Sequence, residues 1–194
     1  MIKTAEFVSL GHPDKTADYI TSYILDRLIE KDPHVKYGTE VMIKGNTVVL
    51  GGEVTGNITF DPLVTWVKDA LREIGYNERY ATLWGNHAID INKIKVINLI
   101  GVQSPEINQG VQQNGWGDQG IFVGYATKGP EFLPKELYLA RKLAKTFYDK
   151  AKSSENLGLD IKAQITLSEN GHVQTAILAI PMREPEEISK EEIR

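Results

Sequence analysis

The segment Gly11-His12-Pro13-Asp14-Lys15 brings an imidazole, a carboxylate and an ammonium group to the expected start of a helix. Free N–H groups and the positive end of the helix dipole make such a position favourable for an anion, for example a phosphate. Asp14 offers the carboxylate oxygens that Mg2+ prefers, and Lys15 adds a positive charge for the same phosphates. The alternative is that Asp14 only complements the helix dipole and that His12 is an ordinary loop residue.

A second candidate is the sequence GGEVTG at residues 51–56, which places a carboxylate between glycines at the end of an expected strand. Glycine permits a ligand or another strand to approach the backbone closely. Glu53 could therefore meet an ammonium group or a metal, or it could be an exposed residue in a bulge. Glu40, on the preceding strand, carries no information by itself.

Residues 103–120 (QSPEINQGVQQNGWGDQG) contain five glutamines, four glycines and no lysine or arginine. A connection of this length inside a compact domain is commonly a lid or a binding loop. The loop holds a single aspartate, Asp118, in glycine-rich backbone just before an expected strand. A polar linker is the alternative, but Ile107 and Trp116 are unexpected in a linker.

Asp160 and Lys162 open the last expected hairpin, where strand alternation makes Lys162 most simply a solvent-facing lysine. His34, His87 and His172 have no metal-ligand spacing and are interpreted as surface residues. The sequence has no Ser-His-Asp order and no Walker-type phosphate loop.

Composition excludes several classes of protein. The 194 residues include 22 Lys+Arg and 26 Asp+Glu, a net charge of −4 that argues against nucleic acid as a main partner. Cysteine is absent, which excludes disulfides, cysteine-based zinc sites and thiol nucleophiles. No run of apolar residues is long enough to span a membrane, and the start lacks the layout of a signal peptide. We therefore expect a cytoplasmic protein without a membrane partner.

Hydrophobic periodicity and capping residues predict the elements that position these side chains. Helices are expected at Pro13–Lys31, from Asp61-Pro62 (a cap residue followed by proline) to Gly75, and at Leu133–Ala151. Strands are expected at Lys36–Lys44, Thr47–Leu50, 93–101, 121–126, Ile161–Leu167 and His172–Ile180. Tight turns between adjacent strands favour an α+β fold, with helices layered on antiparallel or mixed sheets, over a doubly wound parallel fold.

The end of the chain is unusual, because residues 189–192 (SKEE) have the form of a capping box with two residues after it. We expect either a frayed tail or a chain cut where a helix begins. The predicted organisation is a first α+β segment at 1–101, a mobile loop at 102–120, a second α+β segment at 121–182 and a charged tail or truncated helix start at 183–194.

Together these motifs resemble the S-adenosylmethionine synthetase (methionine adenosyltransferase) family. The resemblance rests on VSLGHPDKTADYI, GGEVTG, IGVQSPEINQGV, GDQGIFVGYAT and DIKAQITL, which occur in the family's order from about Thr4 to Ile188. It implies three similar βαββαβ-like α+β domains that exchange chain segments, of which this chain would hold one nearly complete domain and parts of others.

The resemblance also implies a reaction and a set of roles. Methionine sulfur attacks C5′ of ATP, tripolyphosphate leaves, and the enzyme hydrolyses it to phosphate and pyrophosphate. The implied catalytic residues are His12, Lys15 and Asp118. The implied ATP and phosphate contacts are His12, Lys15, Asp160 and Lys162, and the implied methionine contacts are Glu53, Gln103 and Asp118. Asp14 would hold Mg2+, Glu40 would hold K+, and residues 103–113 would form a mobile loop over the site.

The departures from the family pattern limit what this chain is expected to do alone. Leu10 replaces an acid that is usual before GHPDK, and Glu106 stands where aspartate is common. Family members are longer, and their remaining part supplies further phosphate contacts and a second Mg2+-binding aspartate. We therefore expect an N-terminal half that is inactive or very weak alone and works as a homo-oligomer or with a complementary C-terminal-half subunit. The alternative is a non-catalytic short paralogue that binds or regulates a full-length synthetase.

Overall fold

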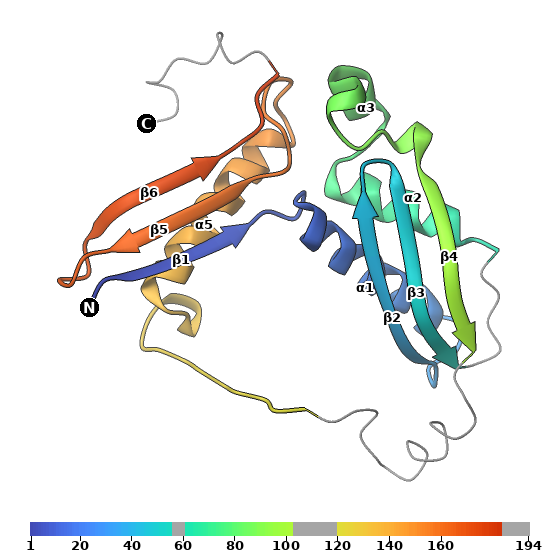
Figure 1. The fold of residues 1–194 in the computed structure, drawn as a ribbon, viewed down its shortest axis with the longest axis horizontal. Coiled ribbons are helices and arrows are strands. Elements are labelled where there is room, and N and C mark those ends of the chain that lie inside the picture. The colour runs from blue at the N-terminus through green and yellow to red at the C-terminus, as the bar shows by residue number, and fades with distance from the viewer. Residues whose placement is uncertain (56–60, 103–119, 184–194) are drawn as a thin grey trace.

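The computed structural model describes residues 1–55, 61–102 and 120–183, which form two three-stranded sheets with helices packed on them (Figure 1). The terminal sheet has the strand order β1-β5-β6, and the hairpin sheet has the order β2-β3-β4. The strands are β1 (Lys3–Val8), β2 (Lys36–Lys44), β3 (Thr47–Thr55), β4 (Lys95–Val102), β5 (Lys162–Leu167) and β6 (Val173–Ala179). The helices are α1 (Pro13–Ile29), α2 (Leu63–Ile74), α3 (Glu78–Trp84) and α5 (Lys135–Ala151). This arrangement confirms the α+β class with antiparallel and mixed sheets.

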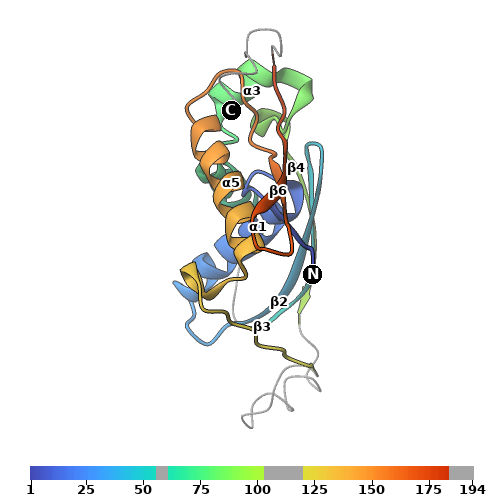
Figure 2. The ribbon, with the colours of Figure 1, turned by 90° about the vertical axis from the view of Figure 1, so that its left-hand side faces the viewer.

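The terminal sheet joins the two ends of the described chain. β1 runs antiparallel to β5, with Lys3 opposite Leu167 and Val8 opposite Lys162, and β5 is antiparallel to β6. The order β1-α1-β2-β3-α2-β4 follows the βαββαβ pattern along the chain, but β1 leaves this unit to pair far away in the sequence. Helix α5 covers one face of the terminal sheet, as the two views of the ribbon show (Figures 1 and 2).

The hairpin sheet combines an antiparallel and a parallel pair. A tight turn containing Gly45, whose φ is +56°, joins β2 to β3. β4 then lies parallel to β3, after a crossover that contains α2 and α3. Alternation along the strands points Val48 and Leu50 toward the helices, so the opposite face of this sheet points away from α1 and α2.

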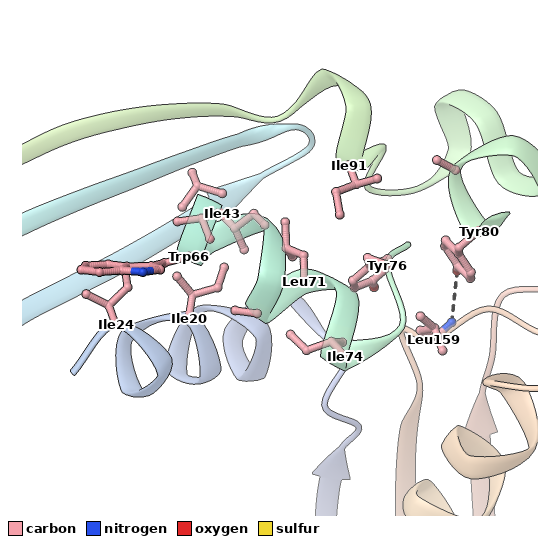
Figure 3. Packing of buried hydrophobic residues seen from close by; sticks show 14 of the residues in the cluster. Ile20, Ile24, Ile43, Trp66, Leu71, Ile74, Tyr76, Tyr80, Ile91 and Leu159 are labelled. Carbon is pink, nitrogen blue, oxygen red and sulfur yellow. Dashed lines mark hydrogen bonds between the residues drawn. The ribbon is translucent and has the colours of Figure 1, made fainter. Parts of the chain in front are cut away.

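The main core lies between the hairpin sheet and the helices α1 and α2, and it continues toward the terminal sheet (Figure 3). Helix α2 has apolar residues at helical spacing, which gives it a continuous buried stripe. Tyr76 and Tyr80 extend this core with an edge-to-face ring pair whose centroids are 5.2 Å apart. The buried residues Leu159 and Ile161, just before β5, belong to the same core. A single apolar cluster therefore links both sheets.

Four of the six predicted strands and all three predicted helices occur within a few residues of their expected positions. The β3 strand is longer than predicted because its glycines do not end it. Gly52 has φ +124°, and a Cβ there would lie 2.1 Å from the carbonyl oxygen of Gly38 on β2, so only glycine fits. Helix α2 begins at Leu63 with Pro62 at the cap position, and the prediction that Asp61 caps it is wrong.

The prediction of a strand at residues 121–126 is also wrong for the described part of the chain. These residues pair with neither sheet, and the side chains of Ile121, Phe122 and Val123 are 88–96% exposed. A run of β-branched and aromatic residues favours an extended strand, but it does not supply a strand edge to pair with. Two elements were not predicted at all, β1 and α3. No helix among the described residues has the length and apolar character needed to cross a membrane.

Candidate active site

The site begins at the turn between β1 and α1, where His12 caps the helix. The backbone N–H of Asp14 donates to Nδ1 of His12 over 3.2 Å, and the imidazole is 9% exposed. A ring nitrogen that accepts a backbone hydrogen bond carries no proton, so in the neutral imidazole the proton is on Nε2. His12 therefore has a hydrogen-bond donor available for an oxygen of a ligand.

The charged side chains that follow His12, those of Asp14 and Lys15, point in different directions. The Asp14 carboxylate is exposed, with one oxygen 3.8 Å from Nδ1 of His12. The Lys15 ammonium lies 4.9 Å from the ring centroid of Phe7, on the α5 side of the terminal sheet. There it lines a cavity of about 290 Å3 together with Arg141 and Tyr148. The structure thus places His12 and Asp14 together and turns Lys15 toward α5.

Asp160 and Lys162 reach the same turn from the start of β5. Burial raises the pKa of the Asp160 carboxyl. A protonated His12 and the ammonium of Lys162 oppose this rise, and the negative charge of Asp14 adds to it. Hydrogen bonds connect the two segments, because Ser9 bonds to His12 in the turn and to Leu159 and Ile161 on both sides of Asp160. Asp160 Oδ1 is buried and accepts no hydrogen bond from any described residue. An acceptor in this state is ready for a donor from outside the chain.

Two tyrosines and a glycine hold the turn against the segment before β5. The Tyr76 hydroxyl donates to the carbonyl of Gly11 over 2.5 Å, and the Tyr80 hydroxyl accepts from the N–H of Leu159 over 3.2 Å (Figure 3). Burial raises the pKa of Tyr80 to about 12, so its hydroxyl stays protonated. A Cβ on Gly11 would lie 2.4 Å from the carbonyl oxygen of Leu159. Glycine is therefore required for the two segments to approach this closely.

Glu40 and Glu53 lie elsewhere, on the face of the hairpin sheet that points away from the helices. Glu40 is opposite Gly51 and Glu53 is opposite Gly38 in the β2–β3 ladder, which puts both carboxylates on the same face. Both side chains are exposed, and the sheet separates them from helix α1. Within one chain the structure therefore forms one cluster around His12 and a separate acidic pair on the hairpin sheet.

The remaining predicted site residues, Gln103 and Asp118, lie outside the described residues, as does the predicted loop at 103–113. A cavity of about 480 Å3 is lined by Lys3, Lys135 and Leu167 among others. These residues are at the end of the terminal sheet opposite the His12 turn. Cavity size by itself therefore does not locate the predicted site.

The donor set suits a hard divalent cation in part. No group of three acidic or histidine side chains that could complete a metal site occurs within residues 1–55, 61–102 and 120–183. Mg2+ is commonly bound by one or two carboxylates together with water and substrate phosphates. The exposed Asp14 carboxylate fits that mode of binding. Glu40 offers one exposed carboxylate, so a K+ ion there would need further oxygens from other groups.

Sequence reasoning did not identify Ser9 or Tyr76 as parts of this site. Ser9 lies next to the motif that was singled out, but its hydroxyl contacts residues about 150 positions away. Tyr76 follows the glycine that ends α2 and looks like an ordinary core residue. In the sequence, Ser9 is marked only by its position next to a motif, and Tyr76 only by its position after a helix end. Neither position reveals a contact with a distant part of the chain.

Comparison with known proteins gives consistent matches over the whole chain. Residues 1–105 match the family model described as "S-adenosylmethionine synthetase, N-terminal domain", and residues 113–194 match the one described as "S-adenosylmethionine synthetase, central domain". The S-adenosylmethionine synthase of a Nitratiruptor species is 37% identical over 171 residues, which are 84% of this chain and 42% of that protein. The S-adenosylmethionine synthase of Methylobacterium radiotolerans is 35% identical over 181 residues, 87% of this chain and 44% of that protein.

A solved structure agrees with these matches. The structure of an unusual S-adenosylmethionine synthetase from Campylobacter jejuni has a TM-score of 0.82 and 31% sequence identity. The match covers 100% of this chain and 51% of that one. The chain thus spans about half the length of the solved relative and less than half the length of the two sequence relatives.

Proposed function

Because the chain belongs to the S-adenosylmethionine synthetase family, we propose that it provides the ATP-binding side of a site that makes S-adenosylmethionine from ATP and L-methionine. The observation that carries this proposal is the hydrogen-bonded junction between the His12 turn and residues 159–161, which brings His12, Asp14 and Asp160 to one helix start, with Lys162 two residues further on. Helix start, imidazole donor and ammonium group together offer a polyphosphate several positive partners. The reaction takes place in the cytoplasm, where both substrates are available.

In the proposed reaction the methionine sulfur forms a bond to C5′ of ATP while the C5′–O bond breaks and tripolyphosphate leaves. Water then cleaves tripolyphosphate to phosphate and pyrophosphate. His12 donates from Nε2 to a phosphate oxygen, and Lys162 places its ammonium against the same charges. Asp160 is an acceptor only, so its free oxygen suits a hydroxyl or amino group of ATP better than a phosphate. Lys15 contacts the phosphates if its side chain turns away from Phe7.

Asp14 is the residue that would hold Mg2+, which supplies positive charge against the phosphates when it is bound. The chain's own contribution is mostly positioning. Sulfur, carbon and leaving oxygen must lie in line, and fixed donors must already face the oxygens where negative charge develops. Glu40 would hold K+, while Glu53, Gln103 and Asp118 would contact methionine.

The separation between the His12 cluster and the Glu40–Glu53 pair supports a site completed by a second chain. Around the two carboxylates, the outward face of the hairpin sheet carries an apolar patch of Met42, Val49, Ile97 and Leu99. Such a patch on an exposed sheet face is suited to self-association. We infer a homo-oligomer in which this face meets its copy, with a complementary C-terminal-half subunit as the other partner.

Turnover with ATP and methionine tests the proposal. The 194-residue chain alone is expected to make S-adenosylmethionine negligibly, because each missing preorganised phosphate contact costs about 3–4 kcal/mol, or roughly 10²–10³ in rate. Adding the polypeptide that corresponds to the remaining part of a relative should restore turnover. Asp14→Asn should abolish the restored activity, whereas Asp18→Asn, an exposed change on the same helix, should not.

Two results would contradict the proposal. Ordinary turnover by the purified chain without a partner would show that copies of this chain complete the site unaided. Failure of every complementing polypeptide, combined with a change in the activity of a full-length synthetase when this chain is added, would favour the non-catalytic, regulatory alternative.

A further inference from the structure

We propose that Ser9 is a positioning residue for ATP, which holds Asp160 and Lys162 in register with the His12 turn; this inference rests on the proposed function. Ser9 is 4% exposed and follows β1 directly. Its hydroxyl donates to the carbonyl of Leu159 over 2.6 Å and accepts from the N–H of Ile161 over 3.0 Å. The hydroxyl therefore bonds to the backbone on both sides of Asp160.

The backbone of Ser9 completes the connection. Its N–H donates to the carbonyl of Ile161 over 2.8 Å, and its carbonyl accepts from the N–H of His12 over 3.1 Å. One residue thus binds the helix-capping histidine on one side and the segment 159–161 on the other. We refer to these four hydrogen bonds as the Ser9 clamp.

The hydroxyl is the part of the clamp that a side-chain substitution removes. Leu159 and Ile161 are 1% and 0% exposed, so water does not readily replace a lost partner at their backbone groups. With alanine at position 9 the segment gains freedom on both sides of Asp160. The Asp160 side chain then loses its fixed direction, and Lys162, two residues later, loses its register with the His12 turn.

The clamp acts on one substrate only. Asp160 lies in the segment that Ser9 joins to the His12 turn, and Lys162 follows two residues later, whereas Glu53 is on the outward face of the hairpin sheet. A loosened clamp should therefore weaken ATP recognition and leave methionine recognition unchanged. General loss of packing would not separate the two substrates in this way.

The first test measures KM for each substrate in the enzyme complemented as described above. Ser9→Ala should raise KM for ATP at least tenfold and keep KM for methionine within twofold of the wild type. Thr16→Val is the matched control, because Thr16 is fully buried and its hydroxyl donates a hydrogen bond to the carbonyl of Leu10 in the same turn and not to residues 159–161. Its KM values should stay at the wild-type level. Equal changes in both variants, or in both KM values of Ser9→Ala, would overturn the proposal.

A second test needs no ligand and separates this proposal from the proposed function. Amide hydrogen exchange of the 194-residue chain should be about tenfold faster at Ile161 in Ser9→Ala than in the wild type, the change expected from the loss of a hydrogen bond worth about 1.4 kcal/mol. Exchange at Ile161 in Thr16→Val should not change. Unchanged exchange in Ser9→Ala would overturn the clamp even where turnover is normal. Absent turnover of the wild type in every complemented enzyme would instead contradict the proposed function, and the exchange data would still decide on Ser9.

A milder variant covers the case in which Ser9→Ala does not fold. Ser9→Cys keeps a polar hydrogen of weaker donor strength at the same position. Its exchange at Ile161 and its KM for ATP should fall between those of the wild type and the alanine variant. Values equal to the wild type in both measurements would contradict a role for the hydroxyl.

Discussion

At the scale of single residues, the site combines groups that are costly for stability with groups that permit close approach. Burial keeps the carboxyl of Asp160 from being fully solvated. One of its oxygens has no hydrogen-bond donor among the described residues. Gly11 is required by the contact with Leu159. The oxygen of Asp160 without a donor does not help the chain to fold. Gly11 lets the start of α1 and the segment before β5 come together where the proposed ATP site lies.

Replacement of Asp160 by asparagine should stabilise the ligand-free chain near neutral pH. Burial raises the pKa of Asp160 above its unfolded value, so the folded state binds this proton more tightly than the unfolded state. The Asp160 carboxyl therefore contributes to the stability of the folded state below its pKa in the unfolded chain, which is about 4. This contribution is lost as the pH rises through the pKa of Asp160 in the folded chain. Asp160→Asn should therefore raise the free energy of unfolding at pH 7 by about 1 kcal/mol or less, since the group is partly exposed to solvent.

Urea unfolding at a series of pH values checks this expectation. The difference between Asp160→Asn and the wild type should shrink toward zero as the pH falls to about 4. Asp18→Asn, an exposed change on α1, should show no such pH-dependent gain. A loss of stability at pH 7 in Asp160→Asn would show that the attraction of His12 and Lys162 outweighs the cost of burial.

A methyl group at position 11 should separate the two segments. The added Cβ would be 2.4 Å from the carbonyl oxygen of Leu159, a contact that only backbone movement can relieve. Gly11→Ala should lower the free energy of unfolding by about 1–3 kcal/mol, as is typical of overpacking. In Gly124→Ala, where no atom lies within 4 Å of the added carbon, unfolding should be nearly unchanged. Similar urea midpoints for the two variants would contradict the tight contact.

At the scale of secondary structure elements, α2 connects the hairpin sheet to the rest of the core. Its buried stripe contacts α1 and the inward face of the sheet, and the chain after it carries the tyrosines that reach the His12 turn. The stability of the proposed site therefore depends on the packing of this helix. Element α5 plays the corresponding role for the terminal sheet, through a smaller cluster around Ala140 and Ile165.

Truncation of a buried residue of α2 tests this role. Leu71 is 0% exposed, and Leu71→Ala should lower the free energy of unfolding by about 2–5 kcal/mol through lost burial and a remaining cavity. Val64, in the first turn of the same helix and 47% exposed, is the matched position, and Val64→Ala should cost about 0.5 kcal/mol or less. Thermal and urea unfolding measure both, and a small effect of Leu71→Ala would mean that α2 is not central to the core.

At the scale of the whole molecule, the separation of the His12 cluster from the Glu40–Glu53 pair is the feature with the largest functional consequence. One chain presents these groups on different sides of the hairpin sheet. A second copy that covers the outward face can bring a new set of residues to each acidic pair. We therefore expect the oligomeric state to be part of the function and not only of stability.

Sedimentation velocity tests the association. The wild-type chain should form a dimer or larger species at micromolar concentration, and Leu99→Glu should weaken this association at least tenfold. Leu99 is 65% exposed within the apolar patch, so a charge there disfavours burial against a copy. Ile29→Glu changes an exposed apolar residue at the end of α1, away from the patch, and should leave the association intact. A wild-type chain that stays monomeric at tens of micromolar would contradict the patch as an interface.

The sequence by itself determined those features that depend on near neighbours in the chain. The helices α1, α2 and α5 and the last hairpin follow from apolar periodicity, from proline and from turn glycines, and these signals act over one or two turns. The motif around His12 was found in the same way, because its residues are adjacent. The family followed from the order of several such local motifs.

Only the tertiary structure decided which distant segments meet. Pairing of β1 with β5 joins residues about 160 positions apart, and no local pattern specifies such a partner. For the same reason the sequence did not predict three features of the site. These are the role of Ser9, the approach of Asp160 to His12 and the direction of the Lys15 side chain. The placement of Glu40 and Glu53 away from α1 likewise depends on which sheet face the helices cover. The free energy of these contacts is set by burial and close packing, which exist only once the chain has folded.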